Sequence, residues 1–289
     1  MAAGSGLRSF HGAVSRLADR IGPPENVVRR TLNPVYTSLL RVLSGARGHP
    51  VDINGQVFRL DPQFRWLSGH GYEREVAEFL ATRITPGQVC FDVGANVGIY
   101  VLQLSRWSAP GGRIVAFEPN PATLKVLRAH VAMNGLDSRV TIVPKGAGAG
   151  AGTATLYDTA GGSGLGRIGA PNPDIHGTVA ITAIEVTAID DFVRETAMIP
   201  DWILIDVEGY EFAALHGAVD TIRRHAPHVV VEVHPRLLSA ESRAAGARLL
   251  EDLELSPVRI SVAGRPETFV SLERRRSSVD TMFTFTAKP

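Results

Sequence analysis

The chain has 289 residues, of which 44% are hydrophobic and 20% are charged. These proportions are typical of a globular protein that buries a sizeable core, and they argue against disorder and fibrous architectures. The 30 Lys and Arg residues nearly balance the 29 Asp and Glu residues, which gives a formal net charge of +1. Bulk electrostatics therefore favour neither nucleic acid nor an anionic membrane as a partner, and a partner is expected at a local site.

The chain contains a single cysteine, Cys90. One thiol excludes an intrachain disulfide and every structural zinc site built on two or more thiolates. The first 48 residues carry seven arginines, but no apolar run long enough for a signal-peptide core or for a bilayer span. We therefore expect a cytoplasmic protein without a transmembrane segment.

The N-terminal part is predicted to be helical up to about residue 50. Its apolar residues between positions 27 and 43 recur at helical spacing, with basic residues between them. Two interpretations remain open: a helix packed on the main domain, or an amphipathic helix in weak peripheral contact with a membrane surface. We assign residues 1–70, which include a short strand pair around 51–60, to an N-terminal region and residues 71–289 to the main domain.

The main domain alternates helical spacing with short apolar runs. Helices are predicted around 76–80, 99–107, 121–133 and 212–222, and strands at 89–93, 113–117, 140–143, 202–207 and 228–233. Nearly continuous apolar strands between amphipathic helices predict an α/β fold with a mostly parallel sheet covered on both faces. Two final strands, 257–262 and 281–286, have no helix between them, so we expect an antiparallel C-terminal edge.

Residues 145–170 contain nine glycines. Because glycine loses much backbone entropy on folding, this stretch predicts a loop around at most one short strand, 153–157. It is either a mobile lid or a surface insertion.

Ligands of parallel α/β sheets bind at the carboxyl ends of the strands. The first of these strands ends in the turn FDVGANVGIY, residues 91–100, where Gly94 and Gly98 permit a tight turn. Glu118 ends the next strand, 20 residues after Gly98. An acidic residue at that spacing typically accepts hydrogen bonds from ribose hydroxyls, which indicates a ligand that contains adenosine.

The turn also discriminates between adenosine ligands. A dinucleotide fingerprint requires glycine where Asn96 and Ile99 stand, which disfavours NAD. Asp92, directly before the turn, would repel phosphate but attract an ammonium group, directly or through water. S-adenosylmethionine carries adenosine at one end and an amino acid at the other, so it satisfies both Asp92 and Glu118. Asn96 either supports the turn or touches the methionine carboxylate.

Four segments in this order and spacing resemble the FkbM-type family of S-adenosylmethionine-dependent methyltransferases: FDVGANVGIY (91–100), AFEPNP (116–121), WILIDVEGYEFAALHGA (202–218) and VVVEVHP (229–235). The likeness runs from about Tyr72 to the C-terminus. It implies a seven-stranded, Rossmann-like class I methyltransferase fold and O-methylation of a hydroxyl on a sugar, glycolipid or natural product. One departure is that residues 145–152 include no acidic side chain to face the adenine.

Candidate catalytic residues follow the fourth and fifth strands of the predicted sheet: Asp206 after the fourth, and Glu232 and His234 at the end of the fifth. Either Asp206 or His234, as an imidazole with a pKa near 6.5, is expected to accept the hydroxyl proton. The three could instead bind a divalent cation such as magnesium that acidifies the hydroxyl. We favour metal-free catalysis.

Tyr72 and Glu73, at the entry of the first helix, and Glu208 are candidate contacts for a small-molecule or glycan acceptor. Three alternatives remain: an N-methyltransferase, an NAD-dependent oxidoreductase, and a catalytically silent binding module of the same fold. The N-methyltransferase is disfavoured, because this sequence has Asp206-Val207-Glu208-Gly209 in place of the Asn-Pro-Pro-Tyr motif used for planar nitrogens. The sequence determines neither the acceptor nor the oligomeric state.

Overall fold

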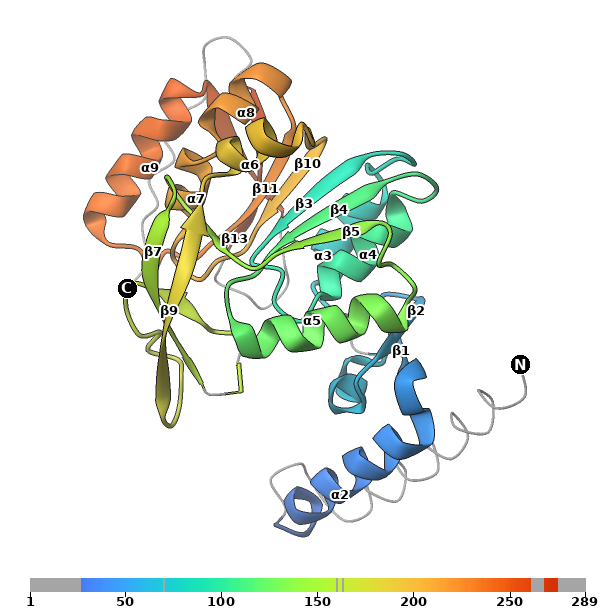
Figure 1. The fold of residues 1–289 in the computed structure, drawn as a ribbon. Coiled ribbons are helices and arrows are strands. Elements are labelled where there is room, and N and C mark those ends of the chain that lie inside the picture. Colours follow the sequence, from blue (N-terminus) through green and yellow to red (C-terminus); the bar gives the residue numbers. More distant parts are fainter. Residues whose placement is uncertain (1–26, 70, 160, 163, 261–267, 275–289) are drawn as a thin grey trace. The chain divides into compact units, whose positions relative to one another are not determined.

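The computed structural model describes residues 27–69, 71–159, 161–162, 164–260 and 268–274 (Figure 1). The chain divides into two compact units. The first comprises residues 1–72 with 132–135, and the second comprises residues 73–131 with 136–289. No helix within the described ranges combines the length and the apolar character that crossing a bilayer requires.

The first unit contains a helix and a strand hairpin. Its elements are α2 (Val27–Ser44), the 3-10 helix η1 (Gly45–Arg47), β1 (His49–Ile53), β2 (Gln56–Leu60) and the 3-10 helix η2 (Pro62–Leu67). The strands are antiparallel and joined by Asn54-Gly55, both with positive φ, as expected for a tight hairpin turn. Helix α2 buries Leu40, whereas Val42 on the same helix is 79% exposed.

The second unit is built on a seven-stranded sheet. In spatial order its strands are β12 (Leu255–Ile260), β13 (Thr268–Arg274), β11 (His228–Val233), β10 (Trp202–Ile205), β3 (Val89–Val93), β4 (Arg113–Phe117) and β5 (Val140–Val143). The strands from β11 to β5 are parallel, whereas β13 runs antiparallel to both of its neighbours. This topology confirms the predicted class I methyltransferase fold with an antiparallel edge.

The C-terminal edge differs from the prediction in detail. Strand β13, which the sequence did not predict, inserts between β11 and β12. The predicted strand at 281–286 lies outside the described residues. Strand β10 ends at Ile205, so Asp206 and Val207 follow the strand.

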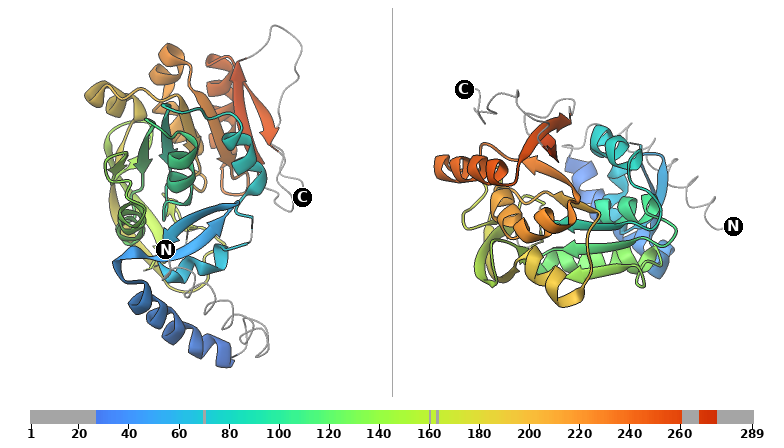
Figure 2. Two further views of the ribbon diagram at one scale, coloured as in Figure 1. Left: turned by 90° about the vertical axis from the view of Figure 1, so that its right-hand side faces the viewer. Right: turned by 90° about the horizontal axis from the view of Figure 1, so that it is seen from above.

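Helices cover both faces of this sheet (Figures 1 and 2). One face carries α3 (Arg74–Ala81), α4 (Ile99–Trp107) and α5 (Pro121–Met133); the other carries α6 (Ile189–Thr196), α7 (Glu211–His216), α8 (Val219–His225) and α9 (Ala240–Asp252). Alternation along β3 sends Phe91 and Val93 into the core under α6 to α9. Asp92 therefore points to the opposite face, where the nearby backbone N–H of Val101 in α4 lowers its pKa.

The glycine-rich stretch contributes three strands to a second sheet: the short strand predicted at 153–157 is confirmed, and the prediction that the rest is loop was wrong in part. Strands β6 (Gly146–Ala147), β9 (Val179–Thr187), β7 (Gly152–Thr159) and β8 (Arg167–Ile168) lie in that order. Strand β7 pairs antiparallel with β9 along all eight of its residues. Strand β7 contains one glycine and three threonines, β9 is rich in β-branched residues, and Leu156, Ile184 and Val186 form a small core. Most of the glycines of this stretch lie in the connections between the strands.

Candidate functional site

The turn after β3 is held tightly against its two neighbouring strands. The backbone N–H groups of Gly94 and Ala95 both donate to the Phe117 carbonyl at 3.0 Å. Gly94 has φ +89°, and a Cβ there would lie 1.8 Å from the Asp206 carbonyl oxygen. The close approach of the backbone after β10 therefore explains why this position requires glycine, as predicted. At Gly98, also with φ +89°, a Cβ would lie 2.5 Å from Leu127 Cδ1.

Glu118 locks this turn from the neighbouring strand. Its Oε2 accepts the backbone N–H of Asn96 at 2.8 Å, and its Oε1 accepts that of Asn120 at 2.7 Å. Burial raises the pKa of Glu118 to about 7, although these two backbone donors lower it. Each carboxylate oxygen has a second lone pair, so Glu118 can still accept hydrogen bonds from a ligand diol.

Asp92 is a buried carboxylate with an unsatisfied oxygen. It is 3% exposed, and its Oδ2 has no hydrogen-bond partner among the described residues. Burial, followed by the charge of Asp206, raises the pKa of Asp92 to about 8. An uncompensated carboxylate at this depth is costly unless a positive group approaches it.

An open pocket lies at the ends of these strands, and its empty space of about 580 Å³ includes solvent at the mouth. The predicted site residues Gly94, Asn96, Glu118, Asp206 and Glu208 line it, and the second sheet contributes further walls. The remaining lining residues are Phe117, Pro119, Asn120, Thr123, Gly146, Ala147, Leu156, Asp158, Gly164, Gly166, Ile168 and Val207. Asp92 is not among the lining residues, so it lies beneath the surface of the pocket.

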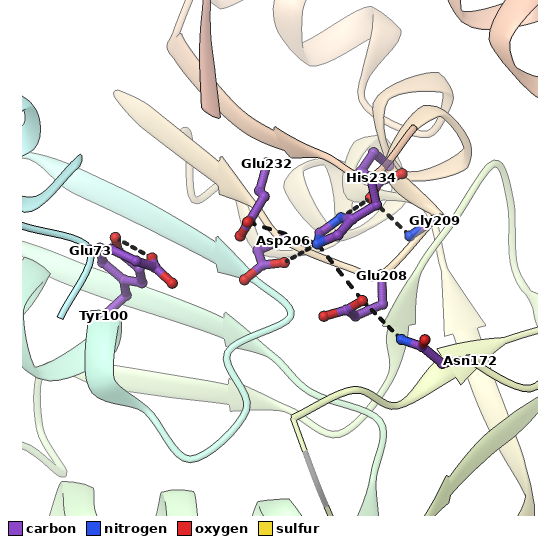
Figure 3. A network of polar contacts seen from close by, with 9 residues as sticks. Glu73, Tyr100, Asn172, Asp206, Glu208, Gly209, Glu232 and His234 are labelled. Atoms are coloured by element: carbon purple, nitrogen blue, oxygen red, sulfur yellow. Dashed lines mark hydrogen bonds and ion pairs between the residues drawn. The ribbon is translucent and has the colours of Figure 1, made fainter. Parts of the chain in front are cut away.

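Carboxylates gather around His234 beside this pocket (Figure 3). Glu211 Oε1 lies 2.6 Å from His234 Nδ1 and also accepts the Gly209 backbone N–H at 2.8 Å. On the other side of the ring, His234 Nε2 lies 3.8 Å from Asp206, 3.7 Å from Glu208 and 3.9 Å from Glu232. The structure thus brings together the three predicted catalytic residues, which come from the ends of β10 and β11.

The protonation state of His234 differs from the expectation of a neutral imidazole. Burial lowers its pKa, but the hydrogen bond to Glu211 and the charges of Asp206, Glu211 and Glu208 together raise the pKa to about 10. Without a cation in the cluster, the raised pKa favours the protonated ring at neutral pH, which disfavours His234 as the proton acceptor. Asp206, whose side chain is 30% exposed, is the better placed candidate.

Of the three predicted acceptor contacts, Glu208 lines the pocket, whereas Tyr72 and Glu73 are not among its lining residues. Glu208 has φ +47°, lines the pocket and accepts a hydrogen bond from Asn172 at 3.1 Å. Glu73 is buried and accepts the Tyr100 hydroxyl at 2.7 Å, and Figure 3 shows this pair apart from the His234 cluster. Tyr72 belongs to the first unit, where its carbonyl accepts from Asn54.

Several polar residues at the site were not among the predicted site residues. Glu211 is fully buried in the first turn of α7 and reaches His234 across 23 positions of sequence. Asp158 on β7 accepts the Asn120 amide at 2.7 Å and lines the pocket. Asn172 lies in the segment between β8 and β9. The alternation of β-branched residues in 179–187 could have revealed β9 and the second sheet, but no local signal marks Glu211.

Comparison with known proteins agrees with this geometry. The family model described as the methyltransferase FkbM domain matches residues 92–253. Over 175 residues the chain is 28% identical to the 31-O-demethyl-FK506 methyltransferase FkbM of Streptomyces tacrolimicus, covering 52% of this chain and 67% of that protein. It is also 28% identical over 89 residues to the ribosomal protein L11 methyltransferase of Carboxydothermus hydrogenoformans, covering 30% of this chain and 28% of that one.

Among solved structures, the FkbM methyltransferase from Methylobacillus flagellatus aligns with a TM-score of 0.47 and 19% identity. That alignment covers 93% of this chain and 60% of the other, so this chain spans less than two thirds of that protein. The family model, in contrast, covers more than half of this chain. The protein therefore belongs to the FkbM family of methyltransferases, which are S-adenosylmethionine-dependent enzymes.

Proposed function

We propose that this protein transfers the methyl group of S-adenosylmethionine to a hydroxyl of a sugar, glycolipid or natural product. The observation that carries the proposal is the position of Asp206. Its carboxylate lines the same pocket as Glu118 and also belongs to the carboxylate cluster around His234. A proton acceptor thus lies next to the predicted donor site, which is what a barely ionised hydroxyl requires.

The residues around the pocket fit the donor. Glu118 retains lone pairs for the ribose hydroxyls, and the buried, unsatisfied Oδ2 of Asp92 favours a cationic ligand above it, directly or through water. No acidic residue lies in 145–152, but Asp158 and Asn120 provide polar groups in the pocket wall. They are our candidates for contacts with the adenine.

When bound, the donor supplies a methyl group on a positively charged sulfonium, already activated for displacement. The task of the chain is then to align the acceptor oxygen with the methyl carbon, and such alignment can lower a barrier by roughly 7 to 11 kcal/mol. The S–CH3 bond breaks as the O–CH3 bond forms. Asp206 takes the hydroxyl proton, while the His234 imidazolium stabilises the cluster's negative charge. The products are a methyl ether and S-adenosylhomocysteine.

Isotope-labelled donor tests this proposal. The protein is incubated with methyl-labelled S-adenosylmethionine and a panel of glycosides, hydroxylated natural products and amines, and products are identified by mass spectrometry. We expect label in methyl ethers, and turnover lowered at least tenfold in Asp206→Asn while donor binding is retained. Label found on nitrogen would instead indicate an N-methyltransferase. Donor binding without transfer to any acceptor would indicate a silent binding module.

A further inference from the structure

The side chains of the His234 cluster are arranged like the ligands of a metal site. The imidazole is held from behind, because the fully buried Glu211 accepts from the Gly209 N–H and contacts Nδ1. This fixes the ring so that Nε2 faces the pocket side. A carboxylate that fixes a histidine through its far nitrogen is the usual outer support of a metal-ligating histidine.

Nε2 points at carboxylates that it does not reach. The His234 side chain is 9% exposed, and among the described residues its Nε2 makes no hydrogen bond. The three carboxylate oxygens opposite it lie at 3.7–3.9 Å. That distance exceeds a hydrogen bond. It does suit two atoms that share one cation, since ligands each about 2.1 Å from a metal can lie up to about 4.2 Å apart.

We infer that Asp206, Glu232 and His234 bind one hard divalent cation, of which Mn²⁺ or Mg²⁺ is the expected class. One ligand atom from each residue lies within 4.8 Å of the others, so small side-chain rotations bring all three onto one ion. Two carboxylates and one imidazole suit a hard or borderline divalent ion, whereas a thiolate site would select a softer one. Glu208, held by Asn172, borders the site without being a required ligand.

The site's position gives the cation a role that rests on the proposed function. Asp206 lines the pocket, so the ion would lie where the acceptor hydroxyl must approach. A cation that binds a hydroxyl oxygen lowers the pKa of that hydroxyl and orients it for attack. This role reverses the metal-free chemistry that the sequence analysis favoured: with the ion bound, His234 is a neutral ligand and the cation takes the place of the imidazolium's charge.

Manganese titration tests the site without any acceptor. The full chain is stripped with a chelator and titrated with MnCl₂, while free Mn²⁺ is followed by electron paramagnetic resonance. We expect one ion per chain, with affinity weakened about tenfold or more in Asp206→Asn and in Glu232→Gln. The control is Asp158→Asn, a buried carboxylate of the same pocket outside the cluster, which should bind Mn²⁺ as the unchanged chain does.

A second measurement guards against misfolded variants. Mn²⁺ should raise the melting temperature of the unchanged protein and of Asp158→Asn, but not that of Asp206→Asn or Glu232→Gln. Absence of Mn²⁺ binding at millimolar concentration, or equal affinity in all folded variants, would overturn the cation site. Full methyl transfer after chelation would also overturn it and leave the proposed function intact. Conversely, Mn²⁺ binding in a chain that binds no donor would remove the proposed function and keep the metal site.

Discussion

At the scale of single residues, Asp92 couples the unliganded protein's stability to its donor site. Its pKa rises from 3.8 to about 8 because the carboxyl is buried and lies near Asp206. The folded chain therefore keeps a proton that the unfolded chain releases above about pH 4. Stability from this group is fully present below that pH and is lost as pH rises through about 8.

Replacing Asp92 should expose this cost. Asp92→Asn removes the titrating group but keeps the shape of the side chain. As pH rises from about 5 to about 9, the melting temperature of the variant should therefore fall less than that of the unchanged protein. At the upper pH it should melt higher by about 2 °C or more, the shift that about 1 kcal/mol gives in a chain of this size. Donor affinity should fall in the same variant. Equal pH dependence of melting in both proteins would contradict the assignment.

A second prediction at this scale concerns Gly94, where the cost of backbone strain can be separated from the cost of a close contact with a Cβ. Gly87 has φ +91° with nothing within 4 Å of a Cβ, whereas a Cβ on Gly94 would meet the Asp206 carbonyl. Gly87→Ala should therefore cost only the backbone strain, about 1 to 3 kcal/mol. Gly94→Ala should be clearly less stable in chemical denaturation and should lose donor binding. Equal losses in the two variants would show that the close contact is not important.

At the scale of elements, the sequence predicted the central strands and their helices best. The bounds of β3, α4, β4 and β5 match the predicted ranges, since each has a continuous apolar pattern ended by a glycine, proline or asparagine signal. The short strand predicted at 153–157 lies within β7, but the second sheet was missed because it depends on the long-range pairing of β7 with β9. The predicted helix at 212–222 is two helices, α7 and α8, interrupted at Gly217 and Ala218.

The candidate site was predictable to a similar extent. Residues that end parallel strands could be placed together from topology alone, which is why Asp206, Glu232 and His234 were found. Glu211 could not be found in this way, because its role depends on how α7 packs beside β11. The pKa of His234 also depends on three surrounding carboxylates, Asp206, Glu208 and Glu211, which only the folded chain brings together.

The second sheet supports the pocket through one hydrogen bond that can be removed. Asp158 on β7 accepts the Asn120 side-chain amide, and Asn120 donates its backbone N–H to Glu118. Asp158→Ala should therefore loosen the segment after β4 and weaken donor binding about fivefold, the equivalent of about 1 kcal/mol. The exposed Asp174→Ala serves as control and should bind as the unchanged protein does. A calorimetric titration of each variant compares the two, and equal affinities would mean that the second sheet does not support the donor site.

At the scale of the whole molecule, every residue assigned to the pocket and to the His234 cluster belongs to the second unit. The class I fold alone does not select a reaction, so the specific chemistry rests on side chains at the strand ends. The activity of the protein therefore depends on whether those side chains bind the predicted donor.

Direct titration of S-adenosylmethionine into the purified protein, followed by calorimetry, is the most direct test. We predict one site per chain, affinity at least tenfold weaker in Glu118→Gln, and unchanged affinity in Glu251→Gln, an exposed carboxylate on α9. NAD titrated under the same conditions should give no heat of binding. Absence of donor binding by the unchanged protein, or equal donor affinity in folded Glu118→Gln, would contradict the central claim that these strand ends hold the methyl donor.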